Sequence, residues 1–224
     1  MANIILKPLP FDGGRMQRVN MKGKKYFILI SGLIFFHLLA SPLLACKGRL
    51  LKVAVVNSTD QAIMGQMLSI LINERTGTTV EIVRPGDLQA CQEAVSKEKA
   101  DIYINYVGMA LTGTEGSNAQ DDPQKAYILA SRYYMQKFDM VWLKPFGFQG
   151  PLTQTAPPGK VDRTLAAPVT TKEVIKKFPV LDRLINKLGG RVDNNAMEEL
   201  LKKCETQDIE TTAREFLMSQ NLIE

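Results

Sequence analysis

The sequence predicts an α/β fold: a mostly parallel sheet with helices on both faces and a helical C-terminus. Lys52–Val56 is a nearly continuous apolar run rich in valine, which is typical of a strand buried on both faces. Short apolar runs then alternate with segments of helical periodicity, and this order predicts parallel strands joined by right-handed crossovers. From Thr171 onward only helical segments are expected.

The expected elements follow from local patterns. Helix-capping residues, Asn57–Asp60, precede the first helix, and Gly77 is placed to end it. Asp122 and Pro123 start a later helix, and Gln149–Arg163, rich in Pro, Gly and Thr, is expected to be a loop or hairpin. The expected strands are Lys52–Val56, Thr79–Val83, Asp101–Asn105, Asp139–Leu143 and Leu165–Val169. The expected C-terminal helices are Thr171–Lys177, Val180–Leu188, Asn194–Cys204 and Ile209–Ser219.

The stretch Asp101–Leu111 gives the first indication of a binding site. Its strand ends at Tyr106, and a Tyr-x-Gly turn follows that includes Gly108. Ligands of open α/β sheets bind in the crevice beyond the carboxyl ends of the strands. Tyr106 is therefore a candidate ligand contact, and the alternative is a tyrosine packed under a loop.

Asn57, Ser58 and Thr59 occupy the corresponding end of the first strand. They are expected to cap the helix that follows. A helix N-terminus also binds anionic groups such as carboxylates. The three residues are therefore candidate ligand contacts as well, and capping alone is the alternative.

The net charge of +5 is concentrated at the N-terminus. Residues 1–45 hold six of the 28 basic residues but only Asp12 of the 23 acidic ones, which leaves 22 of each in the remainder. Because the remainder is neutral and has no basic stripe with interleaved aromatic residues, we expect no nucleic-acid partner.

The segment Met21–Cys46 has the layout of a secretory signal. Three lysines precede an apolar stretch, Tyr26–Ala40, and Leu43–Cys46 resembles a bacterial lipobox. This predicts a periplasmic or cell-envelope protein anchored to the membrane by a lipidated Cys46. A cleaved signal and an uncleaved anchor are the alternatives. Met21 is the expected start, with residues 1–20 an upstream extension.

Few residues of the remaining chain suit catalysis or metal binding. The only histidine, His37, lies in the apolar signal stretch, so the mature chain has none for acid–base chemistry or metal ligation. No nucleophile motif, phosphate-binding loop or metal cluster is present, and we expect no enzyme, no metal and no cofactor. Cys91 and Cys204 form either a disulfide or two free thiols.

Five segments, in order, resemble the glycine betaine/carnitine/choline substrate-binding proteins of ABC transporters. They are NSTDQAIMGQML (Asn57–Leu68), DIYINYVGMAL (Asp101–Leu111), DMVWLKPFGF (Asp139–Phe148), the closing region Ala166–Leu200 and the end TTAREFLMSQNL (Thr211–Leu222). The resemblance implies a periplasmic-binding-protein-like lobe, an ABC transporter permease as partner and a small quaternary-amine ligand. Tyr106 matches a tyrosine of the aromatic cage that holds such ligands.

One departure from the family pattern bears on function. Family members have two lobes that close on the ligand, but only Gln149–Leu165 separates the segments that resemble the hinge and the closing region. A domain needs about 50 residues or more, so the second lobe is expected to be missing. The expected organisation is residues 1–45 as extension and signal, and 46–224 as one lobe with a loop at 149–165.

The resemblance implies two functions. The first is an exported substrate-binding component of an ABC importer, with Tyr106, Asn57, Ser58, Thr59 and Gly108 as ligand contacts and Phe148 adding an aromatic edge. Its affinity is expected to be weakened by the lost lobe, which removes most aromatic faces of the cage. The second is an interaction or sensor module of the cell envelope that keeps the lobe fold without capturing a ligand.

Overall fold

The computed structural model describes residues 50–112, 114, 122–151 and 164–224, all within the compact unit Cys46–Glu224. Their strands form one sheet in the order β2-β1-β3-β6-β4, and β5 pairs with β6 beside this path. The strands are β1 Leu50–Ala54, β2 Thr79–Val83, β3 Ile102–Tyr106, β4 Met140–Trp142, β5 Gln149–Gly150 and β6 Thr164–Thr171.

The sheet is mixed, and one strand accounts for the mixture. β1 pairs in parallel with both β2 and β3. β6 pairs antiparallel with β3, β4 and β5, so it alone among the described strands runs against the others. The predicted α/β class is confirmed, and the first three strands are parallel as predicted. The expectation of a mostly parallel sheet holds only for these strands, because β6 pairs antiparallel with all three of its partners.

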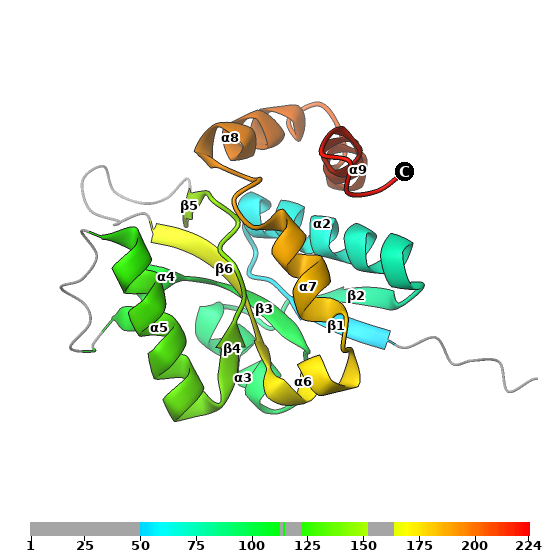
Figure 1. Cartoon of the computed structure of the whole chain (residues 1–224). Helices are drawn as coiled ribbons and strands as arrows, with labels where there is room; N and C mark the ends of the chain where they lie inside the picture. The colour runs from blue at the N-terminus through cyan, green and yellow to red at the C-terminus, as the bar shows by residue number, and fades with distance from the viewer. Residues whose placement is uncertain (1–49, 113, 115–121, 152–163) are drawn as a thin grey trace, which may run out of the picture. The chain divides into compact units, whose positions relative to one another are not determined.

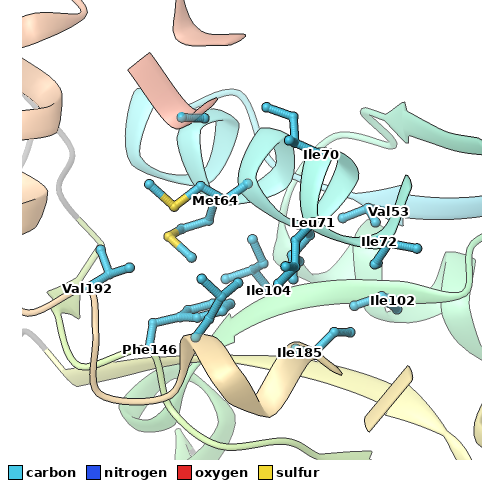
Figure 2. Packing of buried hydrophobic residues seen from close by; sticks show 14 of the residues in the cluster. Val53, Met64, Ile70, Leu71, Ile72, Ile102, Ile104, Phe146, Ile185 and Val192 are labelled. Atoms are coloured by element: carbon cyan, nitrogen blue, oxygen red, sulfur yellow. The ribbon is translucent and has the colours of Figure 1, made fainter. Parts of the chain in front are cut away.

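Helices cover both faces of the sheet, as expected (Figure 1). One face, with Val53, Ile102 and Ile104, packs in a core with α2, α7, α8 and α9; the other, with Ala54 and Tyr103, packs with α3, α4 and α5. Figure 2 shows the first core, in which Met64, Phe146 and Val192 lie together at one end. The helices are α2 Thr59–Thr76, α3 Leu88–Ser96, α4 Val107–Leu111, α5 Pro123–Phe138, α6 Lys172–Lys177, α7 Leu181–Ile185 with the 3-10 turn Asn186–Leu188, α8 Asn194–Lys203 and α9 Ile209–Ser219.

The helix ends agree with the sequence in all but one respect. Gly77 adopts the left-handed conformation after α2, with φ 67°, and Asp122 caps α5 with its side chain. Ser58 is the N-cap residue of α2, but its side chain makes no capping hydrogen bond. Gln61 satisfies a nearby donor instead, because its Oε1 accepts a hydrogen bond from the Val56 N–H at 3.0 Å. The N-cap thus lies within the predicted segment, but Ser58 makes no side-chain capping hydrogen bond there.

Three expected features lie partly or wholly outside the described residues. They are the signal segment, the lipidated Cys46 and most of the expected loop at 149–165. Of that loop, Gln149 and Gly150 pair with Leu165 and Thr164. In the described part of the chain, no helix has the length and apolar character needed to cross a membrane.

The two thiols are free in the structure. Cys91 is buried on α3, and Cys204 is half-buried after α8. Burial raises the pKa of the Cys91 thiol to about 11, with a further contribution from the negative charge of Asp87. The disulfide alternative is not realised, and the thiol of Cys91 stays protonated at neutral pH.

The short strand β5 packs directly on the end of β3. A Cβ added at Gly150 would lie 2.4 Å from Cε1 of the Tyr106 ring, so no larger residue fits there without movement. The ring itself is fully buried and held at its hydroxyl, and it has little freedom to yield. Gly150 thus allows the backbone of β5 to touch Tyr106.

We predict that Gly150→Ala lowers the free energy of unfolding by about 1–3 kcal/mol, the usual cost of overpacking a filled core. The loss should shrink in a Tyr106→Leu background, where the ring that the new methyl group meets is gone. Chemical denaturation of the two single variants and the double variant measures this coupling. Equal losses in both backgrounds would contradict the packing described for β5.

Candidate functional site

The candidate site lies where β1 and β3 end. Because these strands are parallel, their carboxyl ends meet at one edge of the sheet. The connection from β1 to α2 brings Asn57, Ser58 and Thr59 to this edge, and Tyr106 is the last residue of β3. The structure therefore places the predicted residues from the two strands at one edge, as the crevice rule requires.

Tyr106 is tied to α2 through its hydroxyl. It is fully buried, and its Oη donates a hydrogen bond to Oδ2 of Asp60 at 2.6 Å. Burial, and then the negative charge of Asp60, raise the pKa of the Tyr106 hydroxyl far above its usual range. The hydroxyl consequently stays protonated at neutral pH and donates to Asp60.

Gln61, the next residue of α2, fixes the same junction from a second direction. While its Oε1 accepts from Val56, its Nε2 donates to the carbonyl oxygen of Ile104 at 3.3 Å. One buried amide thus joins the β1–α2 turn to β3. Asp60 was predicted only as a helix-capping residue, and Gln61 was not singled out, although both lie in the first segment that resembles the family.

The three residues before Asp60 differ in accessibility. Asn57 and Thr59 are exposed, and Ser58 is half-buried. The Ser58 hydroxyl oxygen is itself buried and has no hydrogen-bond partner among the described contacts. Asn57 and Thr59 are therefore the members of this group that stand open at the edge of the sheet.

Gly108 and Phe148 lie inside the protein. The Gly108 N–H donates to Oγ1 of Thr164 at 2.8 Å, and a Cβ at Gly108 would lie 2.6 Å from that side chain. Phe148 is fully buried and stacks on Phe146, with ring centroids 6.3 Å apart and planes 13° apart. Both Tyr106 and Phe148 belong to the core that covers the α2 face.

A polar network lies on the opposite face of β3. Asn105 Nδ2 donates to the hydroxyl oxygens of Tyr103 and Tyr134, at 3.2 and 3.1 Å, and its Oδ1 accepts from the Tyr106 N–H at 2.8 Å. Tyr134 in turn donates to Gln92 at 3.0 Å. This network joins α3 and α5 to the strand end, so the position of Tyr106 is fixed from both faces of the sheet.

The site contains hydrogen-bonding groups and aromatic rings. No group of three or more His, Cys, Asp or Glu side chains suited to a metal ion occurs among the described residues. A carboxylate, a tyrosine ring and exposed polar residues at a helix start are groups that can bind a small polar or cationic molecule.

The chain matches a family model over most of its length. That model, the substrate-binding domain of the ABC-type glycine betaine transport system, matches residues 49–127 and 113–219. The two matches include β1, β3 and the start of α2, and so the whole edge described above.

Individual proteins give weaker likenesses. The carnitine transport binding protein OpuCC of Listeria monocytogenes serotype 1/2a (strain 10403S) is 29% identical over 100 residues. That match covers 44% of this chain and 32% of OpuCC, so the chain spans about a third of the curated relatives it matches.

Two solved structures share the fold. A glycine betaine/carnitine/choline ABC transporter protein superposes with a TM-score of 0.65 at 18% identity, covering 80% of this chain and 100% of that one. YehZ from Escherichia coli in its apo form gives 0.64 at 13% identity, covering 77% and 99%. These likenesses confirm the lobe fold, and the family model goes further: the chain belongs to the family of substrate-binding domains of ABC-type glycine betaine transport systems.

Proposed function

We propose that this chain is the substrate-binding component of an ABC importer for quaternary amines such as glycine betaine, carnitine and choline, and that it captures them weakly with one lobe. The observation that carries the proposal is the family match over residues 49–219, which includes both strand ends of the crevice. An ABC transporter permease is the partner that this role requires.

The arrangement of Tyr106 supports weak capture. A quaternary ammonium group has no proton to donate, so proteins hold it against aromatic faces, each worth about 0.5–2 kcal/mol. The edge at the end of β3 holds the Tyr106 ring, and Phe148 belongs to the same core. The ring lies under Gly150, and a ligand has to displace β5 before it can touch the ring. That displacement lowers affinity further.

A second candidate is an envelope interaction module that does not capture a ligand. The burial of the two aromatic residues favours it. Tyr106 and Phe148 are fully buried, and the Tyr106 hydroxyl already has Asp60 as its partner. In this role the tyrosine stabilises the strand end, and the exposed Asn57 and Thr59 belong to a docking surface.

For the first function we predict that choline or glycine betaine binds with a dissociation constant on the order of millimolar. Loss of two or three cage faces at about 1–2 kcal/mol each corresponds to a 30-fold to 10⁴-fold weaker affinity than a complete cage. Tyr106→Ala and Tyr106→Leu should both abolish binding, whereas Tyr133→Ala, a half-buried tyrosine on α5, should not.

Isothermal calorimetry and ligand-observed NMR measure these affinities. A micromolar constant for the monomer would contradict the one-lobe account, as would binding that survives both Tyr106 substitutions. If wild-type protein binds neither ligand at tens of millimolar, the interaction module is the better proposal.

We further propose that the chain is exported and anchored by lipid on Cys46, since residues 21–46 have the layout of a lipoprotein signal. Cys46→Ser should abolish incorporation of labelled palmitate and make maturation insensitive to globomycin. Cys204→Ser, which removes a half-buried thiol of the folded unit, should leave both unchanged. Equal labelling of wild type and Cys46→Ser, or no labelling of either, would contradict the proposed lipid anchor on Cys46.

A further inference from the structure

We propose that Asp60 is a positioning residue of the ligand site, whose buried carboxylate holds the Tyr106 hydroxyl and makes the ring a stronger acceptor for a cation. The inference rests on the proposed function, in which Tyr106 contacts a quaternary ammonium group. It assigns to Asp60 a role in cation selectivity that goes beyond holding α2 against β3.

Asp60 is an unusual residue for its position. It is the second residue of α2, its side chain is fully buried, and its Oδ2 lies 2.6 Å from the Tyr106 hydroxyl oxygen. Aspartate is rarely buried completely, because desolvating the charge is costly unless it is paired or hydrogen-bonded. The positive end of the α2 dipole favours a carboxylate in the first turn. The helix start thus stabilises a negative charge at one end of the tyrosine.

That charge acts on the ring through the hydroxyl. A hydrogen bond donated to a carboxylate is shorter and stronger than one between neutral groups. Donation moves electron density toward the phenolic oxygen and the ring, so the ring face becomes more negative. Cation–π attraction is electrostatic and grows with that negative potential.

The position of Asp60 allows the Tyr106 ring to be uncovered while its hydroxyl keeps the hydrogen bond to Asp60. Asp60 contacts the hydroxyl, whereas the backbone at Gly150 approaches the ring at Cε1. β5 pairs with β6 over only two residues, so its local opening costs less than opening the central strands. A methylated ammonium group can then reach the ring face through the space that β5 leaves, while the Asp60 hydrogen bond and the Gln61 contacts hold the strand end.

The expected selectivity follows from charge rather than shape. Choline and 3,3-dimethyl-1-butanol have nearly the same shape, but only choline is a cation. A residue that merely supports the fold weakens both compounds alike when it is replaced. A residue that makes the ring more negative weakens choline alone, so the ratio of the two affinities separates the two roles.

NMR titration of the purified chain with each compound measures that ratio. Asp60→Asn keeps the size of the side chain and an acceptor oxygen but removes the charge, and Tyr106→Phe keeps the ring but removes the donor. Each should lower the preference for choline by about three- to tenfold, and the double variant should lower it no further. Asp87→Asn, which neutralises the N-cap carboxylate of α3, is the matched control and should leave the ratio unchanged.

The outcomes distinguish this inference from the proposed function. If wild-type protein prefers choline and neither Asp60→Asn nor Tyr106→Phe changes the preference, the role of Asp60 is refuted while ligand capture stands. Additive effects of the two substitutions also refute it. If wild-type protein binds neither compound, both the proposed ligand capture and the role of Asp60 are refuted. Because Tyr106→Phe tests the hydrogen bond without altering Asp60, the test remains decisive if Asp60→Asn does not fold.

Discussion

The hydrogen bond from Tyr106 to Asp60 is the interaction on which the candidate site depends. At 2.6 Å it joins the last residue of β3 to the first turn of α2, and both residues are fully buried. Gln61 and Asn105 fix the same strand end by separate hydrogen bonds. The end of β3 is therefore held by several hydrogen bonds, whereas β5 pairs with β6 over only two residues.

The loss of a second lobe, which we propose, would give this protein a different problem from that of a binding protein with two lobes. A lobe that closes over a ligand excludes water and adds aromatic faces. In this chain the backbone at Gly150 packs against the edge of the Tyr106 ring at Cε1. This contact helps to keep a large aromatic ring out of water, and in the proposed function it makes β5 a competitor of the ligand. Weak capture and a well-packed core would then be two consequences of the same contact.

Much of the fold could be predicted from the sequence, because valine-rich runs and helical periodicity report burial directly. The first three strands, the left-handed Gly77 and the cap at Asp122 are examples. The reversed direction of β6 could not be predicted, since a run of apolar residues does not specify which neighbour it pairs with. Tyr106 was predicted at the strand end, but its burial by Gly150 depends on a contact between residues 44 positions apart. Asp60 was not predicted as a site residue, because its place before the first helix is explained by helix capping alone.

The most direct test of the account is to locate the ligand on the protein. Amide ¹H–¹⁵N spectra recorded during a titration with millimolar choline should show shifts confined to 57–61, 106–108 and 149–150, the segments that meet at the end of β3. The shift changes of all these amides should fit a single dissociation constant. Shifts centred on another surface, such as the groove between α8 and α9 lined by Arg191, Leu200 and Phe216, would contradict the proposed site. So would spectra that do not change at all.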